Sequence, residues 1–175
     1  KNGFLHISDV HPAHFPKGKS TDSEAVGRKQ SQRHRPPIQQ CYKRGQEVIV
    51  QMTKEGIGTK GATLTTYLSI PGRLLVMMPG MSKLGVSRKI EDEETRSKAR
   101  EMLGQLTLPD NMGFIVRTAG LGSTKRDLQR DLDYLLRLWK SIEARSEKVT
   151  APAEIYQESD LVIRTLRDSY NRDIK

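Results

Sequence analysis

The sequence has few of the residues on which secreted and membrane proteins depend. It contains one cysteine, Cys41, so no internal disulfide can form and no cysteine-based metal site can be completed within the chain. No apolar run approaches the ~20 residues needed to span a bilayer, and the N-terminus lacks the pattern of a signal peptide. We therefore expect a cytoplasmic protein without a transmembrane segment.

The sequence is also poor in candidates for catalysis. Its 4 histidines all lie within the first 34 residues, and no nucleophile stands beside an evident base. His11 and His14 have a spacing that suits a metal, but the surrounding segment offers no further ligand set. The acidic residues fall mainly in predicted helix faces and turns rather than in clusters on strands. We expect no complete active site in this chain.

Positive charge is what the chain has in excess. Its 175 residues include 30 Lys and Arg against 21 Asp and Glu, a formal net charge of +9. An acidic polymer is the simplest partner for such a chain, because phosphate contacts release counterions without any sequence readout. The alternative at this point is an ordinary solvated basic surface.

The residue pattern predicts a β-rich first half and a mixed second half, hence an α+β fold. The strongest helix has apolar residues at three- and four-residue intervals, and Thr124 with Asp127 resembles a capping box. A long loop rich in Pro, Gly, Ser and basic residues covers about 11–40. The predicted strands are 3–8, 46–55 and 61–70 (an antiparallel pair), 73–79, 85–90 and 112–117, and the predicted helices are 91–106, 124–148 and 160–172.

The stretch 112–127, "MGFIVRTAGLGSTKRD", contains the strongest candidate for a site. Arg117 and Thr118 stand at the carboxyl end of an apolar strand, where a rigid guanidinium fork and a hydroxyl could hold a phosphate. The turn with Gly120 and Gly122 could add backbone N–H groups at a helix start. Formal phosphate-loop patterns fail, however, and an edge arginine beside a plain glycine turn explains these residues equally well.

Four further residues are weaker candidates. Lys60, at a predicted loop tip, is typical of a solvated charge, and Phe4 is more often a core residue than a base-stacking one. Arg88 and Lys89 form a basic pair that could equally be surface filler.

Several strings together resemble one family. They are "GFLHISDV" (3–10), "GQEVIVQMTKEGIGTKGATLTTYLSIPGRLLVMMP" (45–79), "GVSRKIED" (85–92), "LPDNMGFIVRTAG" (108–120), the long helix with Trp139, and "QESDLVIRTLRD" (157–168). Their order is similar to that of the bacterial ribonuclease E/G family, whose catalytic half is an endoribonuclease that cuts single-stranded RNA and is stimulated by a 5′-monophosphate. The resemblance covers nearly the whole chain apart from the basic loop at about 17–40.

The resemblance implies a domain plan. Residues 1–69 would be part of an antiparallel OB-fold β-barrel of the ribosomal-protein S-one type, 70–161 a mixed α/β sensor for the RNA 5′ end, and 162–175 the start of an RNase H-like domain. We therefore expect a piece of a longer protein whose remaining OB strands precede Lys1.

The resemblance also implies roles for individual residues. Arg117 and Thr118 would hold the 5′-phosphate, with Gly72 and Val76 lining the pocket. Phe4 and Lys60 match RNA-contacting positions. Arg88 and Lys89 align with a basic pair in the sensor, although the family usually has Ser-Arg-Arg where this sequence has Ser-Arg-Lys.

For the parent protein, the resemblance implies a metal-dependent hydrolase acting in RNA processing and mRNA decay, in a bacterial or organellar cytoplasm. Mg²⁺-binding aspartates and a CxxC pair that holds structural Zn²⁺ between subunits would lie beyond Lys175, so this chain would bind neither metal and be inactive alone. Partners would be single-stranded RNA with a 5′-monophosphate, further copies in a homo-oligomer, and an RNA-degradation complex. The alternatives are a non-catalytic OB-fold RNA-binding module, for example translation-associated, and an enzyme for phosphate-linked small molecules built on the Gly120 turn.

Overall fold

A computed structural model describes residues 2–16, 35–82 and 84–158. The chain forms two compact units, and the division falls within the strands of the second sheet. Unit 1 contains 1–70, 77–85 and 108–114, and unit 2 contains 71–76, 86–107 and 115–175. The helix predicted at 160–172 lies outside the described residues.

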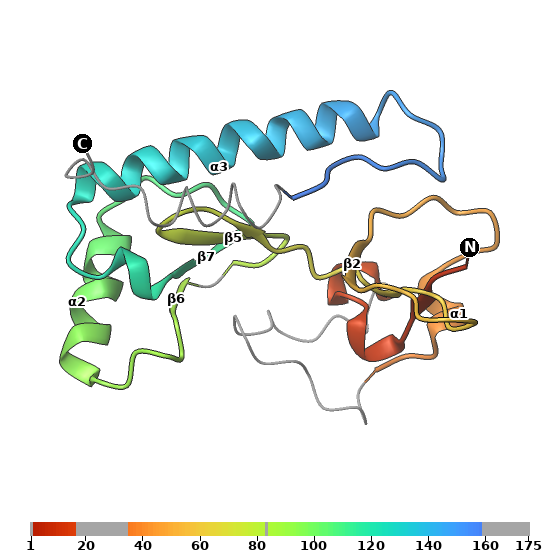
Figure 1. Cartoon of the computed structure of the whole chain (residues 1–175), viewed down its shortest axis with the longest axis horizontal. Helices are drawn as coiled ribbons and strands as arrows, with labels where there is room; N and C mark the ends of the chain where they lie inside the picture. Colours follow the sequence, from red (N-terminus) through yellow and green to blue (C-terminus); the bar gives the residue numbers. More distant parts are fainter. Residues whose placement is uncertain (1, 17–34, 83, 159–175) are drawn as a thin grey trace. The chain divides into compact units, whose positions relative to one another are not determined.

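Unit 1 contains a three-stranded sheet with the order β1-β3-β2. Figure 1 labels its strand β2. The strands are β1 (Phe4–Leu5), β2 (Gln51–Lys54) and β3 (Thr63–Thr65). The β2–β3 pair is antiparallel, as the sequence predicts, whereas β1 pairs with β3 in parallel. The predicted first strand is shortened because a 3-10 helix, Ile7–Asp9, begins two residues after β1.

Short helical segments replace part of the predicted loop. A 3-10 helix covers Pro12–His14, and α1 covers Ile38–Cys41. A backbone contact connects the chain just before this loop to the end of β3, because Thr66 N–H donates to the Asp9 carbonyl at 2.9 Å. The buried Thr65 adds a hydroxyl bond to the same carbonyl at 3.0 Å.

The second sheet has four strands in the order β4-β5-β7-β6. These are β4 (Ile70–Pro71), β5 (Leu75–Pro79), β6 (Leu84–Val86) and β7 (Met112–Val116). The last three were predicted as strands from their apolar runs. Together with the helices below, they confirm the α+β class and an open, partial barrel.

Two α-helices lie among the described residues of unit 2, α2 (Glu93–Gly104) and α3 (Lys125–Ser146). Asp92 caps α2 by accepting a hydrogen bond from Thr95 N–H at 2.7 Å. The Thr95 side chain and backbone N–H hold the pKa of the Asp92 carboxyl below its usual range, so the cap is complete at neutral pH and weakens as pH falls through that lowered pKa. The capping box of α3 is present as predicted.

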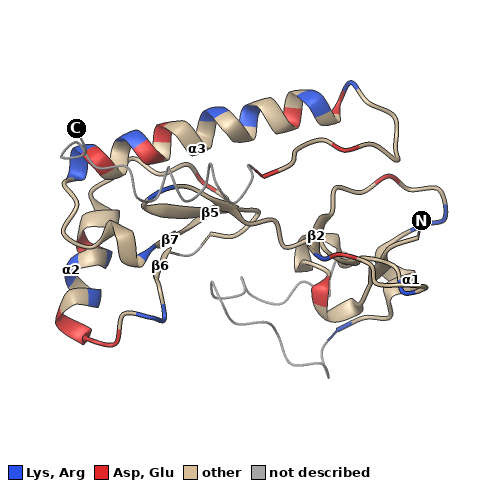
Figure 2. Ribbon diagram, in the orientation of Figure 1, with Lys and Arg blue, Asp and Glu red and all other residues tan. Residues whose placement is uncertain are grey.

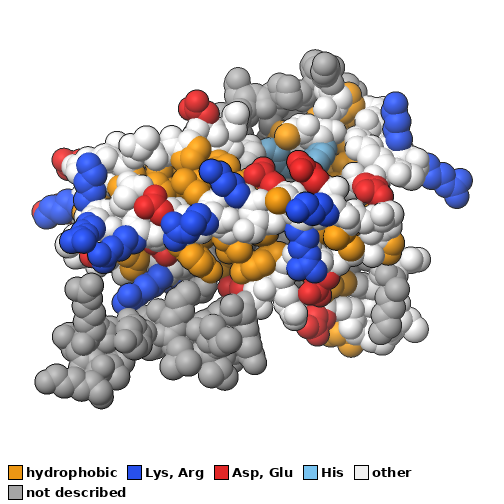
Figure 3. All heavy atoms as spheres, turned by 90° about the horizontal axis from the view of Figure 1, so that it is seen from above, with side chains coloured by type: hydrophobic (Ala, Val, Ile, Leu, Met, Phe, Trp, Pro, Cys, Tyr) orange, Lys and Arg blue, Asp and Glu red, His pale blue; other side chains and the backbone are white. Residues whose placement is uncertain are grey.

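One side of α3 is buried and the other is charged. The buried residues are Leu128, Leu132, Leu135, Trp139 and Ile142, which is the apolar stripe expected from the sequence. Lys and Arg alternate with Asp and Glu along the same helix (Figure 2). The face in Figure 3 likewise mixes both signs with apolar side chains. The net positive charge of the chain therefore does not by itself identify an RNA-binding surface. Such a surface has to be identified from the local arrangement of side chains.

Candidate nucleic-acid interface

Arg117 is held in place at the end of β7 by contacts with the chain before β5. Its backbone N–H donates to the Leu74 carbonyl at 2.8 Å. Its guanidinium Nη1 donates to the Gly72 carbonyl. A guanidinium has five N–H donors in a planar fork, so it can hold a carbonyl on one side and contact an anion on another. Arg117 is half-buried, and its guanidinium is held at the Gly72 carbonyl.

Thr118 and Val76 lie on the two segments that Arg117 connects, Thr118 next to Arg117 and Val76 after Gly72. Thr118 is exposed and begins the 3-10 helix Thr118–Gly120, directly after Arg117. Val76 is half-buried in β5, four residues after Gly72. The structure thus brings 72–76 and 117–118 together through the two carbonyl contacts of Arg117.

The glycines after Thr118 shape the turn. Gly120 is buried, and a Cβ placed on it would lie 2.9 Å from the Leu74 oxygen. The Gly120 N–H donates to the Arg117 carbonyl at 2.9 Å, and this N–H is therefore bonded within the turn. Gly122 has φ of +72°, a conformation that favours glycine. Downstream, the Thr124 side chain accepts from Asp127 N–H at the start of α3. The Gly120 and Thr124 groups are thus bonded within the chain.

Asp131 is a residue of this site that the sequence reasoning missed. Its Oδ1 accepts from Arg73 N–H at 2.9 Å, and its Oδ2 accepts from Leu74 and Leu75 N–H, both at 2.8 Å. Three successive N–H groups directed at one point make an anion nest, and here the protein's own carboxylate fills it. Asp131 of α3 thus fixes the turn that follows Gly72, and the Gly72 carbonyl accepts from the Arg117 guanidinium.

A signal for Asp131 was present in the sequence. It lies three residues after Leu128 and four before Leu135, on the apolar side of an amphipathic helix. A carboxylate in that position must find donors, because burying an unpaired charge is costly. What the sequence did not show was that the donors are backbone groups of residues 73–75.

Arg88 and Lys89 are exposed in a turn next to the Arg117 segment. Ser87 N–H donates to the Val116 carbonyl at 2.8 Å, one residue before Arg117. The turn closes with Ile90 N–H donating to the Ser87 carbonyl at 3.1 Å. This places the start of the basic pair beside β7, within unit 2.

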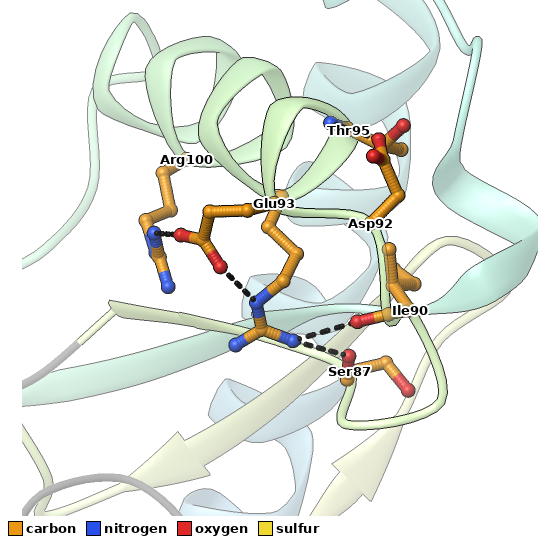
Figure 4. Close-up of polar contacts among 7 residues, drawn as sticks. Ser87, Ile90, Asp92, Glu93, Thr95 and Arg100 are labelled. Atoms are coloured by element: carbon orange, nitrogen blue, oxygen red, sulfur yellow. Dashed lines mark hydrogen bonds and ion pairs between the residues drawn. The ribbon is translucent and has the colours of Figure 1, made fainter.

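Arg96 of α2 contacts this basic turn at the Ser87 and Ile90 carbonyls, which are drawn in Figure 4. Its Nη1 donates to the carbonyls of Ser87 at 3.1 Å and Ile90 at 3.0 Å. Glu93 lies 3.5 Å from its Nε and also pairs with Arg100 at 3.0 Å. The Arg96 side chain is only 21% exposed, so these contacts are partly shielded from water.

We predict that Arg96→Met lowers the free energy of unfolding by about 1 to 3 kcal/mol, because two carbonyls lose a charged donor. The matched control is Arg100→Met, which removes the exposed partner of the same Glu93 and should cost under about 1 kcal/mol. Urea denaturation of both variants measures the difference. Equal losses would show that Arg96 contributes only an exposed ion pair.

Phe4 and Lys60 lie in unit 1, on neighbouring segments. Phe4 N–H donates to the Ala62 carbonyl at 2.7 Å, and Lys60 precedes Ala62 by two residues. Lys60 is exposed and ends a turn in which its N–H donates to the Ile57 carbonyl at 3.1 Å. The Phe4 side chain is 60% exposed rather than buried in the core.

The described residues offer no metal site or membrane span. Within 2–16, 35–82 and 84–158, no three His, Cys, Asp or Glu side chains are grouped so that they could hold a metal ion. Over the same ranges, no helix has the length and apolar character needed to cross a membrane.

Comparison with known proteins gives the class of the chain. The model of the Ribonuclease E/G family matches residues 69–175, more than half of the sequence. The chain therefore belongs to the ribonuclease E/G family, and the resemblance seen in its motifs is confirmed.

Individual relatives extend the match to nearly the whole chain. Identity is 42% to Ribonuclease E of Haemophilus influenzae, over 99% of this chain and 17% of that protein. It is 40% to Ribonuclease E of Escherichia coli K12, over 99% and 15%, and 38% to Ribonuclease G of Salmonella typhimurium, over 96% and 32%. The chain thus spans about a sixth of the ribonuclease E relatives and about a third of the ribonuclease G relative.

Proposed function

We propose that this chain binds single-stranded RNA and senses its 5′-monophosphate, as part of an endoribonuclease that acts in RNA processing and mRNA decay. The observation that carries the proposal is the arrangement of Arg117, whose guanidinium donates to the Gly72 carbonyl and which is followed directly by the exposed Thr118. Family membership and the names of the relatives support the nuclease part.

The proposed chemistry is charge-assisted hydrogen bonding. A terminal phosphate carries up to two negative charges and accepts bonds from the Arg117 fork and from the Thr118 hydroxyl. Bonds of this kind are each worth roughly 1.5 to 3 kcal/mol. A 5′-hydroxyl lacks these acceptors, so one such bond corresponds to a preference of about 10-fold or more for the monophosphate.

The rest of the proposal assigns roles to the remaining candidates. Val76 lines the 5′ nucleotide pocket together with Gly72, while Arg88 and Lys89 contact the following phosphates. Phe4 stacks on a base and Lys60 neutralises a phosphate. Hydrolysis with Mg²⁺, a Zn²⁺-linked homo-oligomer, partners in an RNA-degradation complex and a cytoplasmic location are proposals for the intact protein.

We predict that Arg117→Ala abolishes most of the preference for a 5′-monophosphorylated oligoribonucleotide over its 5′-hydroxyl counterpart. Arg117→Lys should retain part of it, because the charge stays while the planar fork is lost. Binding titrations of the intact protein with both oligomers give the ratio of affinities.

The matched control is Arg137→Ala, which removes an exposed arginine of α3 and should leave the ratio unchanged. If wild type and Arg117→Ala prefer the 5′-monophosphorylated oligomer over the 5′-hydroxyl oligomer to the same degree, Arg117 is not the phosphate ligand. RNA binding without any cleavage by the intact protein would instead favour a non-catalytic module.

A further inference from the structure

The exposed Phe4 ring has the imidazole of His6 as a neighbour. The two ring centroids are 6.2 Å apart with an interplanar angle of 32°. That separation lies within the range of interacting aromatic pairs. Both residues are exposed, and they are two positions apart at the edge of the sheet in unit 1.

The His6 ring is fixed by its own chain. Its Nδ1 accepts from Ser8 N–H at 3.2 Å and lies 2.8 Å from the Ser8 hydroxyl. That hydroxyl donates to Asp9 Oδ2 at 3.1 Å, and the Asp9 carbonyl is bonded to Thr65 and Thr66. An exposed ring held in this way loses little freedom when a ligand binds.

This arrangement also sets the chemistry of the ring. Because Nδ1 is turned to Ser8, Nε2 is the ring nitrogen left for a ligand. His6 therefore presents an apolar face and one polar ring nitrogen near Phe4. An unpaired nucleobase matches both features, since it has a π-face to stack and polar edge groups that form hydrogen bonds.

A cation stands in the same row of the sheet. Thr63 of β3 is registered with Phe4 of β1 on one side and with Lys54 of β2 on the other. The register of β2 with β3 is irregular between Met52 and Lys54, as at a β-bulge. Neighbouring strands are roughly 4.8 Å apart, so the backbone of Lys54 lies about 10 Å across the sheet from that of Phe4. Lys54 is exposed and is suited to a backbone phosphate of the strand whose base meets the rings.

We propose that His6 and Phe4 together form a binding site for one unpaired nucleobase of RNA, with Lys54 neutralising a phosphate of the same strand. This inference rests on the proposed RNA binding but not on the 5′-phosphate site. His6 is the new contact, and Ser8 is its positioning residue.

The test compares two 5′-hydroxyl oligoribonucleotides, one complete and one in which the bases are removed at successive central positions. His6→Ala in the intact protein should weaken binding of the complete oligomer about 3- to 10-fold and leave the abasic one unchanged, because only a base meets the rings. His6→Phe should restore stacking and recover part of the loss. Lys54→Gln should weaken both oligomers alike and lower the salt dependence by about one phosphate contact.

Tyr134→Ala, which removes an exposed ring from α3, is the control for loss of any surface aromatic. Unchanged thermal unfolding of each variant shows that the fold is retained. If His6→Ala binds both oligomers as wild type does while Phe4→Ala weakens the complete one, the inference is wrong and Phe4 acts alone. If wild type binds neither oligomer, the proposed RNA binding itself fails.

Discussion

Replacement of Asp131 by alanine is expected to lower the free energy of unfolding by about 2 to 4 kcal/mol. The change leaves three backbone N–H groups, those of residues 73–75, without their acceptor. Each unsatisfied donor costs roughly 1 to 3 kcal/mol when buried, and Arg73 is exposed enough for water to replace part of that loss. Chemical denaturation measures the change.

The matched control is Asp133→Ala, two residues along the same helix. Asp133 is exposed and accepts from the Gln129 side chain at 2.9 Å, so its loss should change stability by no more than about 0.5 kcal/mol. Equal losses for the two variants would show that the Asp131 contacts contribute nothing specific.

Asp131→Asn tests whether Asp131 positions the Gly72 turn in addition to stabilising the fold. The amide keeps one acceptor oxygen but turns an N–H₂ group towards a backbone donor, so the Gly72 turn should shift without unfolding. If that turn positions Arg117, the preference for a 5′-monophosphate should fall while affinity for a 5′-hydroxyl strand stays constant. A proportional loss of both affinities would assign Asp131 a purely structural role.

Gly72→Ala is expected to be the second damaging change, with a loss of about 2 to 3 kcal/mol and reduced 5′-phosphate discrimination. A Cβ on Gly72 would lie 2.5 Å from Asp131 Oδ2 and 2.9 Å from its Cγ. Asp131 cannot move away without breaking its three hydrogen bonds, and overpacking of this kind typically costs 1 to 3 kcal/mol.

Two comparisons make this prediction specific. Gly104→Ala at the end of α2 should be neutral or slightly stabilising, because a Cβ there would meet nothing within 4 Å. In a double-mutant cycle, Gly72→Ala should cost clearly less in an Asp131→Ala background than in wild type. Additive losses would mean that the two residues do not meet as the structure shows.

Much of the secondary structure was predictable because its signals are local. The stripe from Leu128 to Ile142 has helical period, and Thr124 with Asp127 forms the expected capping box. The apolar runs ending at Pro79 and Val116 became β5 and β7. The first strand was predicted too long, because the side chains of His6 and Ser8 bond to nearby groups and the chain turns into a 3-10 helix at Ile7.

The candidate site was predictable only as a set of residue types. Arg117 and Thr118 could be chosen from the sequence, since a guanidinium and a hydroxyl at the end of an apolar strand suit a phosphate. The residues alone fit a plain turn equally well, and the comparisons show the family of the chain without testing this site. The phosphate and RNA roles of the individual residues stay predictions, to be decided by the titrations described above.

The sequence by itself determined the α+β class, the long amphipathic helix, the basic balance and the motifs of the family, because each depends on residue type and short spacing. Only the tertiary structure decided that Asp131 fills the nest at 73–75, that Gly72 holds the Arg117 guanidinium, and that Phe4, Thr63 and Lys54 share one row. These contacts join residues 9 to 59 positions apart. Their partners are backbone groups, which every residue carries, and strand register, which is set by the packing of the whole sheet.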